Sequence, residues 1–546
     1  MTATRNPVEK AIDTLLERWL ETSADPAMRL AVWRVPGNAL SLVSAFIEAQ
    51  QQPETAGTPD LFVQFSTSFE TSYRYSRALK DELLDGYLRS RDTLTELALK
   101  VDWNGPFEPH PDTATGFLGL LDSFTRHHGE HLRYSVAVLW PEQVGSTTAL
   151  EQWLTQALTA PVPERVRLVL VDSMARPIWQ GLIDKHPAQT RLIEAPLDMF
   201  DIARATAAQA GAGGPPGTTA YRQLLTDVMS LLDKRSAAQT AHRADRALAI
   251  AERQSWPDQQ VVLHLAVAGA HMKEKHYGEA VLRYRRAREC ALVALVQQHP
   301  AANDLLMQGW FGEAGALLAA KQPEHAAQAY AEAAQVAASI PNPLFVIEGQ
   351  RMAGHALAQA HQREQALQQY LQGVSAAREM AAPDRAMTTF PLLLQNLLQL
   401  EDPRRATQLA TRADDYQKAV ADVHVRAEHR AAKLGDAPAR DALDSIDAEL
   451  LEQCESAFAK LVKEREQLIA GGDVFFRKTV AVGRELLHSG WNGMPDVRHP
   501  QDKPIAEWSE PPGFLPLPDG NDLAETPLAP APDAPNATEP LLENHA

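Results

Sequence analysis

A histidine-rich run, His127 to His131, offers one direct match to a metal-binding pattern. It reads His-His-Gly-Glu-His and fits H-x-x-E-H, in which two histidines one helical turn apart bind zinc and the glutamate acts as a general base. Gly129 weakens the helix that this arrangement requires, and no third ligand segment follows. The polar end of a helix explains the run better, so we expect no metal or other cofactor and keep a zinc hydrolase only as an alternative function.

A second candidate is the turn within residues 31–46, AVWRVPGNALSLVSAF, which reads as strand, tight turn and helix. A phosphate-binding loop begins this way and has the pattern G-x-x-x-x-G-K-[ST]. Its glycines let backbone N–H groups face the phosphates, its lysine neutralises them and its hydroxyl holds magnesium. If Gly37 is the second glycine, the other positions fall on Val32, Asn38 and Ala39. The cation and the metal ligand are missing, so this phosphate loop is predicted to be degenerate.

Acidic residues follow two later apolar runs and are the candidates for a catalytic carboxylate near such a loop. Glu142 comes shortly after the run 134–140, and Asp172 lies at the end of the run 165–173. Elsewhere no Ser-His-Asp, Cys-His or close carboxylate-pair arrangement rises above chance. We therefore predict that the protein is not an enzyme, with a nucleotidase that uses Glu142 and Asp172 as the alternative.

Short apolar runs alternate with helical stretches in the first 209 residues. The runs are Arg29–Val35, Asp60–Ser66, Tyr134–Trp140, Arg165–Ser173 and Thr190–Pro196. Their nearly continuous Val, Leu and Ile content is typical of strands buried on both faces, and helical connections between strands require a parallel sheet. Residues 1–209 are therefore predicted to form an α/β domain. The Gly- and Pro-rich residues 210–220 are predicted to be a linker.

The strand signal disappears over residues 221–417, and the chain repeats itself. Each repeat has a small residue, a large residue four positions later and a small residue three positions after that. Three copies lie 40 residues apart and two are less regular: Ala326/Tyr330/Ala333, Ala366/Tyr370/Gly373, Ala406/Ala410/Ala413, Ala280/Tyr284/Ala287 and Ala244/Leu248/Ala251. Small residues let paired helices approach closely, and tyrosines fill the gap between neighbouring pairs. This pattern predicts an all-α superhelical solenoid.

The remaining chain divides into helices and a tail. Residues 418–494 are predicted to be helical, and in 441–469 apolar residues at a 3-4 spacing form a seam that packs on the solenoid or on a partner. Residues 495–546 are Pro-rich and hold few large apolar clusters. We predict that this tail is mostly disordered.

The repeats resemble the tetratricopeptide repeat (TPR), whose second helix carries Ala, Phe or Tyr, and Ala, although the spacing of 40 exceeds the usual 34. The degenerate loop, four further strands and then repeats together resemble a STAND-type P-loop NTPase domain joined to TPR-like repeats. The resemblance implies a P-loop NTPase-like sheet that has lost its phosphate chemistry. A doubly wound α/β domain with no nucleotide history is the alternative.

The TPR resemblance implies a concave groove, lined by the first helix of each pair, that binds a protein or peptide. The groove positions are Lys273, Phe311, Arg351, His355, Gln359 and Gln395. The alternative for each residue is a solvated face with no ligand. We expect a protein-binding scaffold, adaptor or chaperone-like protein, and a regulatory STAND-type ATPase switch is the competing function.

Composition excludes several other classes of protein. The net charge of -18 repels phosphate backbones, so no nucleic-acid binding is expected. The two cysteines, Cys290 and Cys454, are too few for a disulfide scaffold and favour reduced thiols in the cytoplasm. No apolar window is long enough for membrane insertion. An Ala-rich, Lys-poor chain favours a bacterial source, and the oligomeric state and the partner's identity stay open.

Overall fold

Two compact units make up the chain in the computed structural model. The structure describes residues 6–52, 55–96, 100–103, 105, 110–195, 197–210, 217–233, 236–340, 343–497, 499 and 517–529. The first unit takes Met1–Ser230 with Lys418–Cys454, and the second takes Leu231–Gln417 with Glu455–Ala546. Residues 418–454, predicted as part of a separate C-terminal segment, therefore belong to the first unit.

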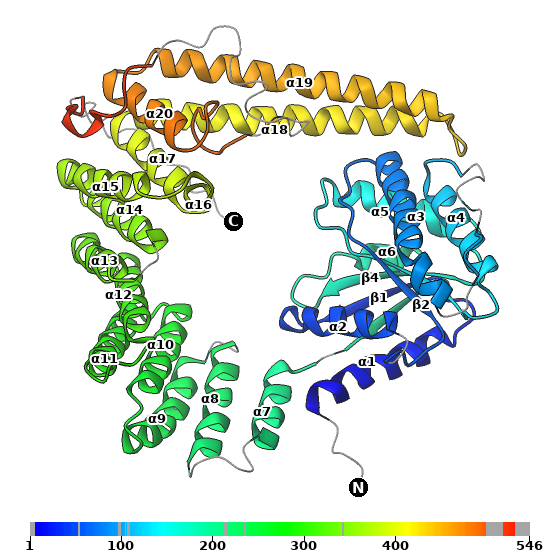
Figure 1. The fold of residues 1–546 in the computed structure, drawn as a ribbon, viewed down its shortest axis with the longest axis horizontal. Coiled ribbons are helices and arrows are strands. Elements are labelled where there is room, and N and C mark those ends of the chain that lie inside the picture. Colours follow the sequence, from blue (N-terminus) through cyan, green and yellow to red (C-terminus); the bar gives the residue numbers. More distant parts are fainter. Residues whose placement is uncertain are drawn as a thin grey trace. The chain divides into compact units, whose positions relative to one another are not determined.

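A five-stranded sheet forms the centre of the first unit (Figure 1). The strands lie in the order β2-β3-β4-β1-β5, and their bounds are β1 Leu30–Val35, β2 Leu61–Phe65, β3 Ser135–Leu139, β4 Val166–Ser173 and β5 Thr190–Glu194. Strand β1 lies between β4 and β5, and its residue Leu30 pairs with Leu168 of β4 and with Thr190 of β5. All four pairings are parallel, so the predicted strands and the parallel sheet are confirmed.

Helices cover both faces of this sheet. One face carries α1 (Pro7–Ser23), α2 (Leu40–Gln51) and α7 (Met199–Ala210), and the other carries α3 (Ser72–Glu96), α4 (Ala114–His127), α5 (Thr147–Thr159) and α6 (Gln180–Lys185). The side chains of β1 alternate between the two cores. Ala31 and Trp33 pack with α1 and α2, whereas Leu30 and Val32 pack with α3, α4 and α5. Burial on both faces explains why the strands are nearly continuous apolar runs.

The second unit consists mainly of successive packed helices joined by short turns. They are α8 (Thr218–Asp233, at the division between the units), α9 (Ala237–Arg253), α10 (Pro257–Lys273), α11 (Tyr277–Val296), α12 (Ala302–Ala319), α13 (Pro323–Ala338), α14 (Pro343–Gln359), α15 (Arg363–Arg378), α16 (Ala382–Ala386) and α17 (Phe390–Glu401). In Figure 1, α10, α12 and α14 lie on one side of the stack and α11, α13 and α15 on the other. This run of packed helices agrees with the predicted helical solenoid.

Glycines facing tyrosine rings allow these helices to approach closely. A Cβ atom at Gly312 would lie 2.1 Å from Cε1 of Tyr284, and one at Gly354 would lie 2.5 Å from Cε1 of Tyr370. Both tyrosines are the large residues of the repeated pattern, and Tyr370 is buried. The predicted packing of small against large residues is therefore confirmed at these contacts.

Five turns of the stack share one backbone conformation. Each contains a non-glycine residue with a φ between 55° and 62°: Ser255, Lys275, Gln298, Lys321 and His361. In the turn after α12, the N–H of Gln322 donates to the carbonyl of Leu317 at 2.9 Å, and the N–H of Lys321 donates to that of Leu318 at 3.0 Å. This Schellman arrangement satisfies the last carbonyls of the helix and reverses the chain in very few residues.

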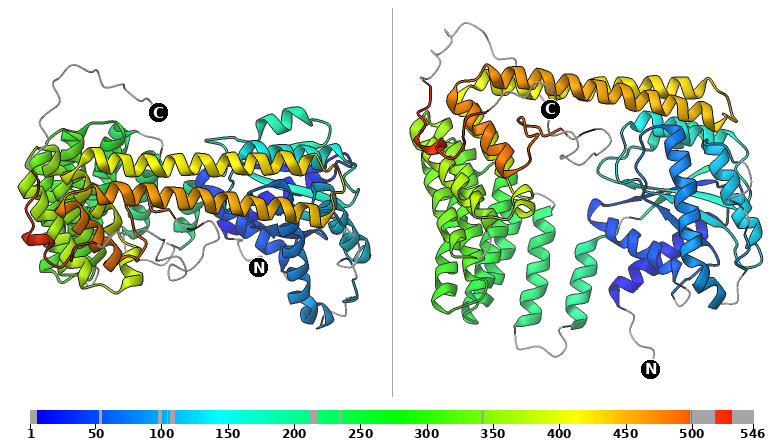
Figure 2. Two further views of the ribbon diagram at one scale, coloured as in Figure 1. Left: turned by 90° about the horizontal axis from the view of Figure 1, so that it is seen from above. Right: turned by 45° about the horizontal axis from the view of Figure 1, so that its top comes forward.

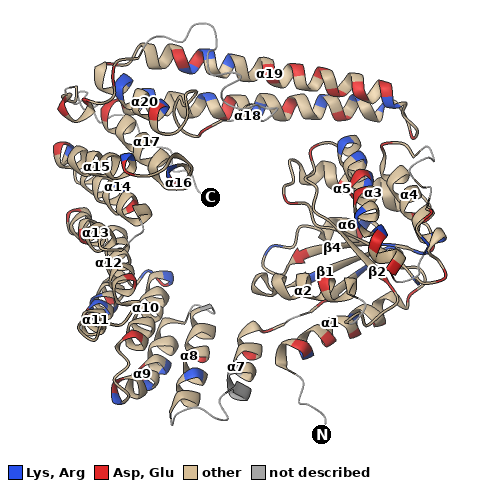
Figure 3. Cartoon of the chain, in the orientation of Figure 1, with Lys and Arg blue, Asp and Glu red and all other residues tan. Residues whose placement is uncertain are grey.

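Long helices follow the stack. They are α18 (Pro403–Ala432), α19 (Arg440–Ala470) and α20 (Val474–Leu486). Figure 2 shows α18 and α19 side by side, and Figure 3 shows basic and acidic residues interspersed along both. Leu443, Ile446, Leu450 and Cys454 are buried together with Val423 of α18, which confirms the predicted apolar seam. These four residues pack within the first unit, past the predicted solenoid, whereas the prediction placed the seam on the solenoid or on a partner. Among the described residues, no helix has both the length and the apolar character that a membrane crossing demands.

The tail departs from its predicted disorder at one stretch. Residues 517–529 pack on α20 and include a 3-10 helix at Leu523–Glu525. Residues 498, 500–516 and 530–546 of the predicted tail lie outside the described residues. The sequence prediction therefore missed an ordered segment of thirteen residues, numbered 517–529.

Candidate functional site

The turn between β1 and α2 has no room for a phosphate loop. Pro36 and the 3-10 helix Gly37–Ala39 connect β1 directly to α2, and the N–H of Ala39 donates to the carbonyl of Pro36 at 2.9 Å. Val32 lies within β1, where it pairs with Leu170 and Leu192. The residues between Val32 and Gly37 are therefore almost all strand. Of the four predicted loop positions, Gly37 and Asn38 are exposed, whereas Val32 and Ala39 are buried in the two cores.

An ion pair occupies the carboxyl ends of β1 and β4. The chain leaves β1 towards one face of the sheet and leaves β4 towards the other, and in doubly wound folds ligands bind at such a switch point. Here Arg34 lies with Nη2 3.2 Å from Oδ2 of Asp172. Asp172 also accepts backbone N–H groups from Ser173 at 3.0 Å and Ile178 at 3.1 Å. Asp172 is thus fully engaged with the protein itself.

The second candidate carboxylate, Glu142, follows β3, which neighbours β4 in the sheet. It is exposed after β3, and its N–H donates to the carbonyl of Ser66 at 2.9 Å. Its side chain lines an open cavity of about 510 Å³ together with Asp81, Glu82 and Asp85. Arg89 is the one cation among the described residues of this lining, so the four carboxylates leave the cavity net negative, which disfavours an anionic nucleotide. In the part of the chain that the structure describes, no group of three His, Cys, Asp or Glu side chains is placed to hold a metal ion.

The histidine run does not form the helical pair that zinc binding requires. Helix α4 ends at His127, so His131 does not lie one turn further along the same helix. Nε2 of His127 is 3.1 Å from Oδ1 of Asp102. The ring of His128 packs against Phe124, and burial together with the neighbouring His127 and His131 lowers the pKa of His128 to about 4. The run is therefore the end of a helix that packs against its neighbours, as the sequence favoured.

The six predicted groove residues do not form one cluster. On α14, Arg351 binds Glu348 of the same helix at 2.7 Å and 2.8 Å, and the ring of His355 hydrogen-bonds the amide of Gln359 at 2.9 Å. Burial and the charge of Arg351 lower the pKa of His355. Arg351 also reaches Asn396 of α17 at 3.4 Å. Four of the six positions are thus on α14 and α17, because Gln395 precedes Asn396.

The other two groove positions are separate from that group. Nζ of Lys273, on α10, donates to the carbonyl of Leu232 at 2.9 Å. The ring of Phe311, on α12, lies 6.0 Å from the rings of Tyr330 and Phe345, so it contributes to packing between helices. Of the six, Lys273 and Gln359 are exposed, and the rest are half-buried.

A surface that sequence reasoning missed lies at the end of α11. Leu292, Val293, Leu295 and Val296 are 48%, 51%, 40% and 85% exposed. Isolated exposed apolar residues are common, but these four lie within the last five residues of α11, where residues three or four positions apart are neighbours on the helix surface. The sequence indicates this surface only through the run Ala-Leu-Val-Ala-Leu-Val at residues 291–296, and such a run is equally typical of a buried helix.

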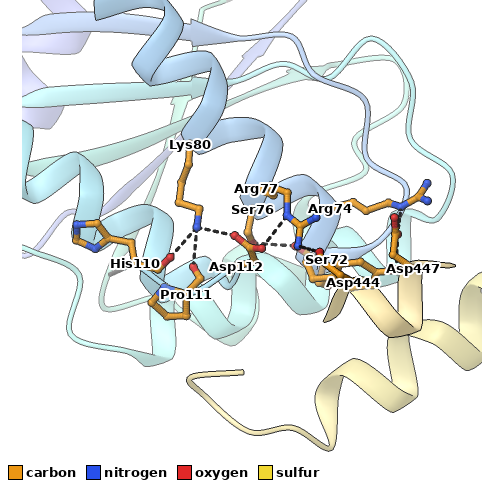
Figure 4. A network of polar contacts seen from close by, with 11 residues as sticks. Ser72, Arg74, Ser76, Arg77, Lys80, His110, Pro111, Asp112, Asp444 and Asp447 are labelled. Carbon is orange, nitrogen blue, oxygen red and sulfur yellow. Dashed lines mark hydrogen bonds and ion pairs between the residues drawn. The ribbon is translucent and has the colours of Figure 1, made fainter. Parts of the chain in front are cut away.

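A polar network joins α3 to the end of the α18–α19 hairpin within the first unit (Figure 4). Arg77 binds Asp112 and Asp444, each at 2.8 Å, and Nζ of Lys80 lies 2.6 Å from Asp112. Burial raises the pKa of Asp112, but hydrogen bonds from Lys80 and Arg77 outweigh it and lower that pKa overall. Glu428 of α18 accepts the N–H of Ser72 at 2.8 Å and so caps the start of α3.

Beside this network lies a cavity of about 430 Å³, lined by the start of α4, the end of α5 and the hairpin turn. Asp112 and Glu428 line it, and both are engaged by the contacts just described. The network accordingly fixes the hairpin end on the sheet unit, and it supplies neither a nucleophile with a base nor a metal-ligand set.

No family model matches the chain, and no curated protein matches it. Among solved structures, the crystal structure of the apo form of RapI matches with a TM-score of 0.30 and 11% sequence identity, over 50% of this chain and 76% of that one.

Proposed function

We propose that this protein is a non-enzymatic scaffold that binds another protein or peptide through its helical stack. The stack is TPR-like in its pairing of small residues with tyrosines across neighbouring helices. In this proposal the sheet unit is a degenerate nucleotide-binding domain, in which Asn38 and Ala39 replace the lysine and the hydroxyl residue of a phosphate loop. Its role in this proposal is structural, since it holds the end of the α18–α19 hairpin.

The exposed apolar turn of α11 carries the proposal. Burial of contiguous apolar surface is the main driving force of protein association, and soluble proteins rarely leave such a surface uncovered without a partner. The partly exposed polar side chains of α14 supply a second surface with hydrogen-bonding capacity. Two surfaces of different chemistry favour a protein partner over a small molecule.

The ion pair at the switch point supports the non-enzymatic part of the proposal. Arg34 and Asp172 bind each other at the strand ends that a ligand of a doubly wound fold would approach, and both carboxylate oxygens of Asp172 accept hydrogen bonds from the protein. The short β1–α2 turn provides no cradle of backbone N–H groups. A regulatory ATPase would need a carboxylate available to its ligand at this position and a longer loop of backbone N–H groups around the phosphates.

The test uses the tagged full chain, isolated with its bound proteins from cells that naturally produce it. The double variant Val293→Asp/Val296→Asp places two charges on the apolar surface, and we expect it to lose at least one partner that the wild-type chain retains. A matched control is Leu88→Asp, because Leu88 is also exposed (56%) but lies on α3 of the sheet unit. The proposal is contradicted if this double variant, Leu88→Asp and the α14 variant Gln359→Lys all recover the same proteins as the wild type.

A further variant shows which of the two surfaces binds the recovered partner. A Gln359→Lys variant adds a charge on α14 at an exposed position without disturbing a buried contact. Loss of the partner in this variant alone assigns binding to the predicted groove, and loss in the α11 variant alone assigns it to the apolar turn.

A further inference from the structure

A short segment near the C-terminus, residues 517–529, lies on α20. Its apolar anchor is one buried leucine, Leu523. Leu523 is 3% exposed and joins the apolar cluster that contains Phe476 and Val482. Gly520 is buried as well, and a Cβ atom there would lie 2.8 Å from Cγ2 of Val482 and 3.2 Å from its backbone nitrogen. The segment therefore approaches the helix more closely than any residue with a side chain permits.

Polar contacts fix the direction of the segment. Nζ of Lys478, on α20, lies 2.6 Å from Oδ2 of Asp522 and donates to Oγ1 of Thr526 at 2.9 Å. Lys478 is almost fully buried, with 9% of its surface exposed. A buried ammonium requires a partner, because removing it from water without one is costly. Asp522 is the carboxylate that satisfies it.

The end of the segment is recognised through its backbone. The N–H of Ala529 donates to Oε1 of Glu401 at 2.9 Å, and the carbonyl of Ala529 accepts from Nη1 of Arg363. Arg363 and Glu401 are themselves paired at 3.0 Å, and they come from the start of α15 and the end of α17. The side chains of Glu401 and Arg363 thus bind the backbone N–H and the backbone carbonyl of one residue, Ala529.

These contacts have the form of peptide recognition. One leucine enters an apolar cluster, one aspartate meets a buried lysine, and a backbone unit is held at the end, all from thirteen consecutive residues (517–529). Peptide-binding domains combine the same elements, with anchors in pockets and hydrogen bonds to the main chain. Apart from the turn at Leu523–Glu525, the described segment contains no helix or strand of its own.

We propose that α20, with Arg363 and Glu401, forms a peptide-binding site that the chain's own residues 517–529 occupy, and that a partner peptide of the same pattern binds there when this segment leaves. The pattern is a glycine, an aspartate two positions later, a leucine immediately after it and a second leucine five positions further on. A tethered segment competes at a high effective concentration, so the site is closed to weak ligands in the resting chain. This inference does not rest on the proposed function, because it uses neither the α11 surface nor the α14 face.

The test measures the fluorescence anisotropy of a labelled peptide, LPDGNDLAETPLA, on addition of the full chain. The wild-type chain is expected to bind it weakly. The Gly520→Val chain is expected to bind at least tenfold more tightly, because its own segment no longer fits against Val482. A control peptide with valine in place of the glycine is expected to bind neither chain.

A charge exchange tests the assigned contact. In the Gly520→Val background, Lys478→Glu is expected to abolish binding of the peptide, and a peptide with lysine in place of the aspartate is expected to restore it. The α11 variant Val293→Asp/Val296→Asp is expected to leave peptide binding unchanged, which separates this site from the proposed partner surface.

Three results would overturn the proposal. The first is a Gly520→Val chain that melts as the wild type does but binds no peptide. The second is a Gly520→Val chain that loses its cooperative helical melt, since the segment would then be part of the core. The third is a wild-type dimer that Gly520→Val converts to a monomer, which would make the occupant a second copy of the chain.

Discussion

Arg34 and Asp172 form a buried ion pair across the two central strands, β1 and β4, with side-chain exposures of 10% and 1%. Each residue is the partner of the other in the sheet register. A ligand in a doubly wound fold would approach these strand ends, so the pair determines what the site can do. It joins β1 to β4 at these ends, and both oxygens of Asp172 accept hydrogen bonds from the protein.

Replacement of Asp172 by alanine is expected to destabilise the sheet unit by roughly 3 kcal/mol, because it leaves two backbone N–H groups without their acceptor and removes the carboxylate that neutralises the buried Arg34, which keeps its hydrogen bonds to the uncharged amide of Gln180. Thermal unfolding followed by circular dichroism should show a decrease of about 6–12 °C in that transition. Asp172→Asn is the matched control, since an amide oxygen still accepts the N–H groups, and it should lose less. Equal stability of Asp172→Ala and wild type would contradict the structural role.

Addition of Mg-ATP is expected to leave the unfolding temperature unchanged, because a bound ligand stabilises the folded state only if a site exists. The double variant Asn38→Lys/Ala39→Ser restores the missing motif residues. We expect it to gain no affinity either, since residues 32–35 are strand and no loop encloses the phosphates. Ala39 is also fully buried, so its hydroxyl variant should be less stable. If isothermal calorimetry detects ATP binding to the double variant, this prediction is wrong, and the β1–α2 turn can still form a phosphate loop.

Gly312 is expected to tolerate no side chain, because its Cβ would lie 2.1 Å from the ring of Tyr284. Gly312→Ala should destabilise the helical stack by about 1–3 kcal/mol through overpacking. Gly278→Ala is the control, since a Cβ there meets no atom within 4 Å and alanine favours the helix. Chemical denaturation of both variants measures the difference. If Gly312→Ala is as stable as Gly278→Ala, the close approach is not required.

The strands and helices were predictable because each is a local pattern. The inner strands are mainly apolar on both faces, so β1 keeps Leu30 and Ala31 buried on opposite sides and reads as a continuous run. The edge strands β2 and β5 are less completely buried, and Glu194 of β5 is exposed. The repeats were visible for the same reason, since Tyr330 and Tyr370 recur at one spacing. Helix α18 extends past residue 417 because no glycine or proline follows Pro403 within it, although the repeated pattern stops there.

The candidate sites were less predictable because they depend on residues far apart in sequence. Arg34 lies 138 positions from Asp172, and Glu401 lies 128 positions from Ala529. A single sequence gives no sign that such residues meet. The ordered stretch of the tail was missed because Pro is the commonest residue of the tail, whereas the attachment of this stretch depends on Leu523, on the close approach of Gly520 and on polar contacts with residues far away in the sequence.

Lys321 has a φ of 61° in the turn after α12, a conformation that costs a residue with a side chain roughly 1–2 kcal/mol. Lys321→Gly removes this strain but adds freedom to the unfolded chain, so we expect a net gain of about 0.5–1 kcal/mol. Lys321→Val should be less stable than wild type, because branching at Cβ is least compatible with this region. Urea unfolding of the two variants provides the comparison, and the opposite order would contradict the assigned turn.

The stability of the second unit is expected to fall as pH rises from 6.5 to 8. Burial, together with a hydrogen bond to Asp473, raises the pKa of Glu401 to about 8 from 4.5. The folded chain therefore holds a proton in this range that the unfolded chain has lost, and stability decreases with pH wherever the folded state binds more protons. Burial lowers the pKa of His264 to about 4, which gives the opposite slope only below its ordinary value of 6.5. Denaturant melts of the wild type and of Glu401→Gln between pH 6.5 and 9 isolate the effect: the difference in unfolding free energy should change up to about pH 8 and then level off, and parallel profiles would show that Glu401 is ionised in the folded chain.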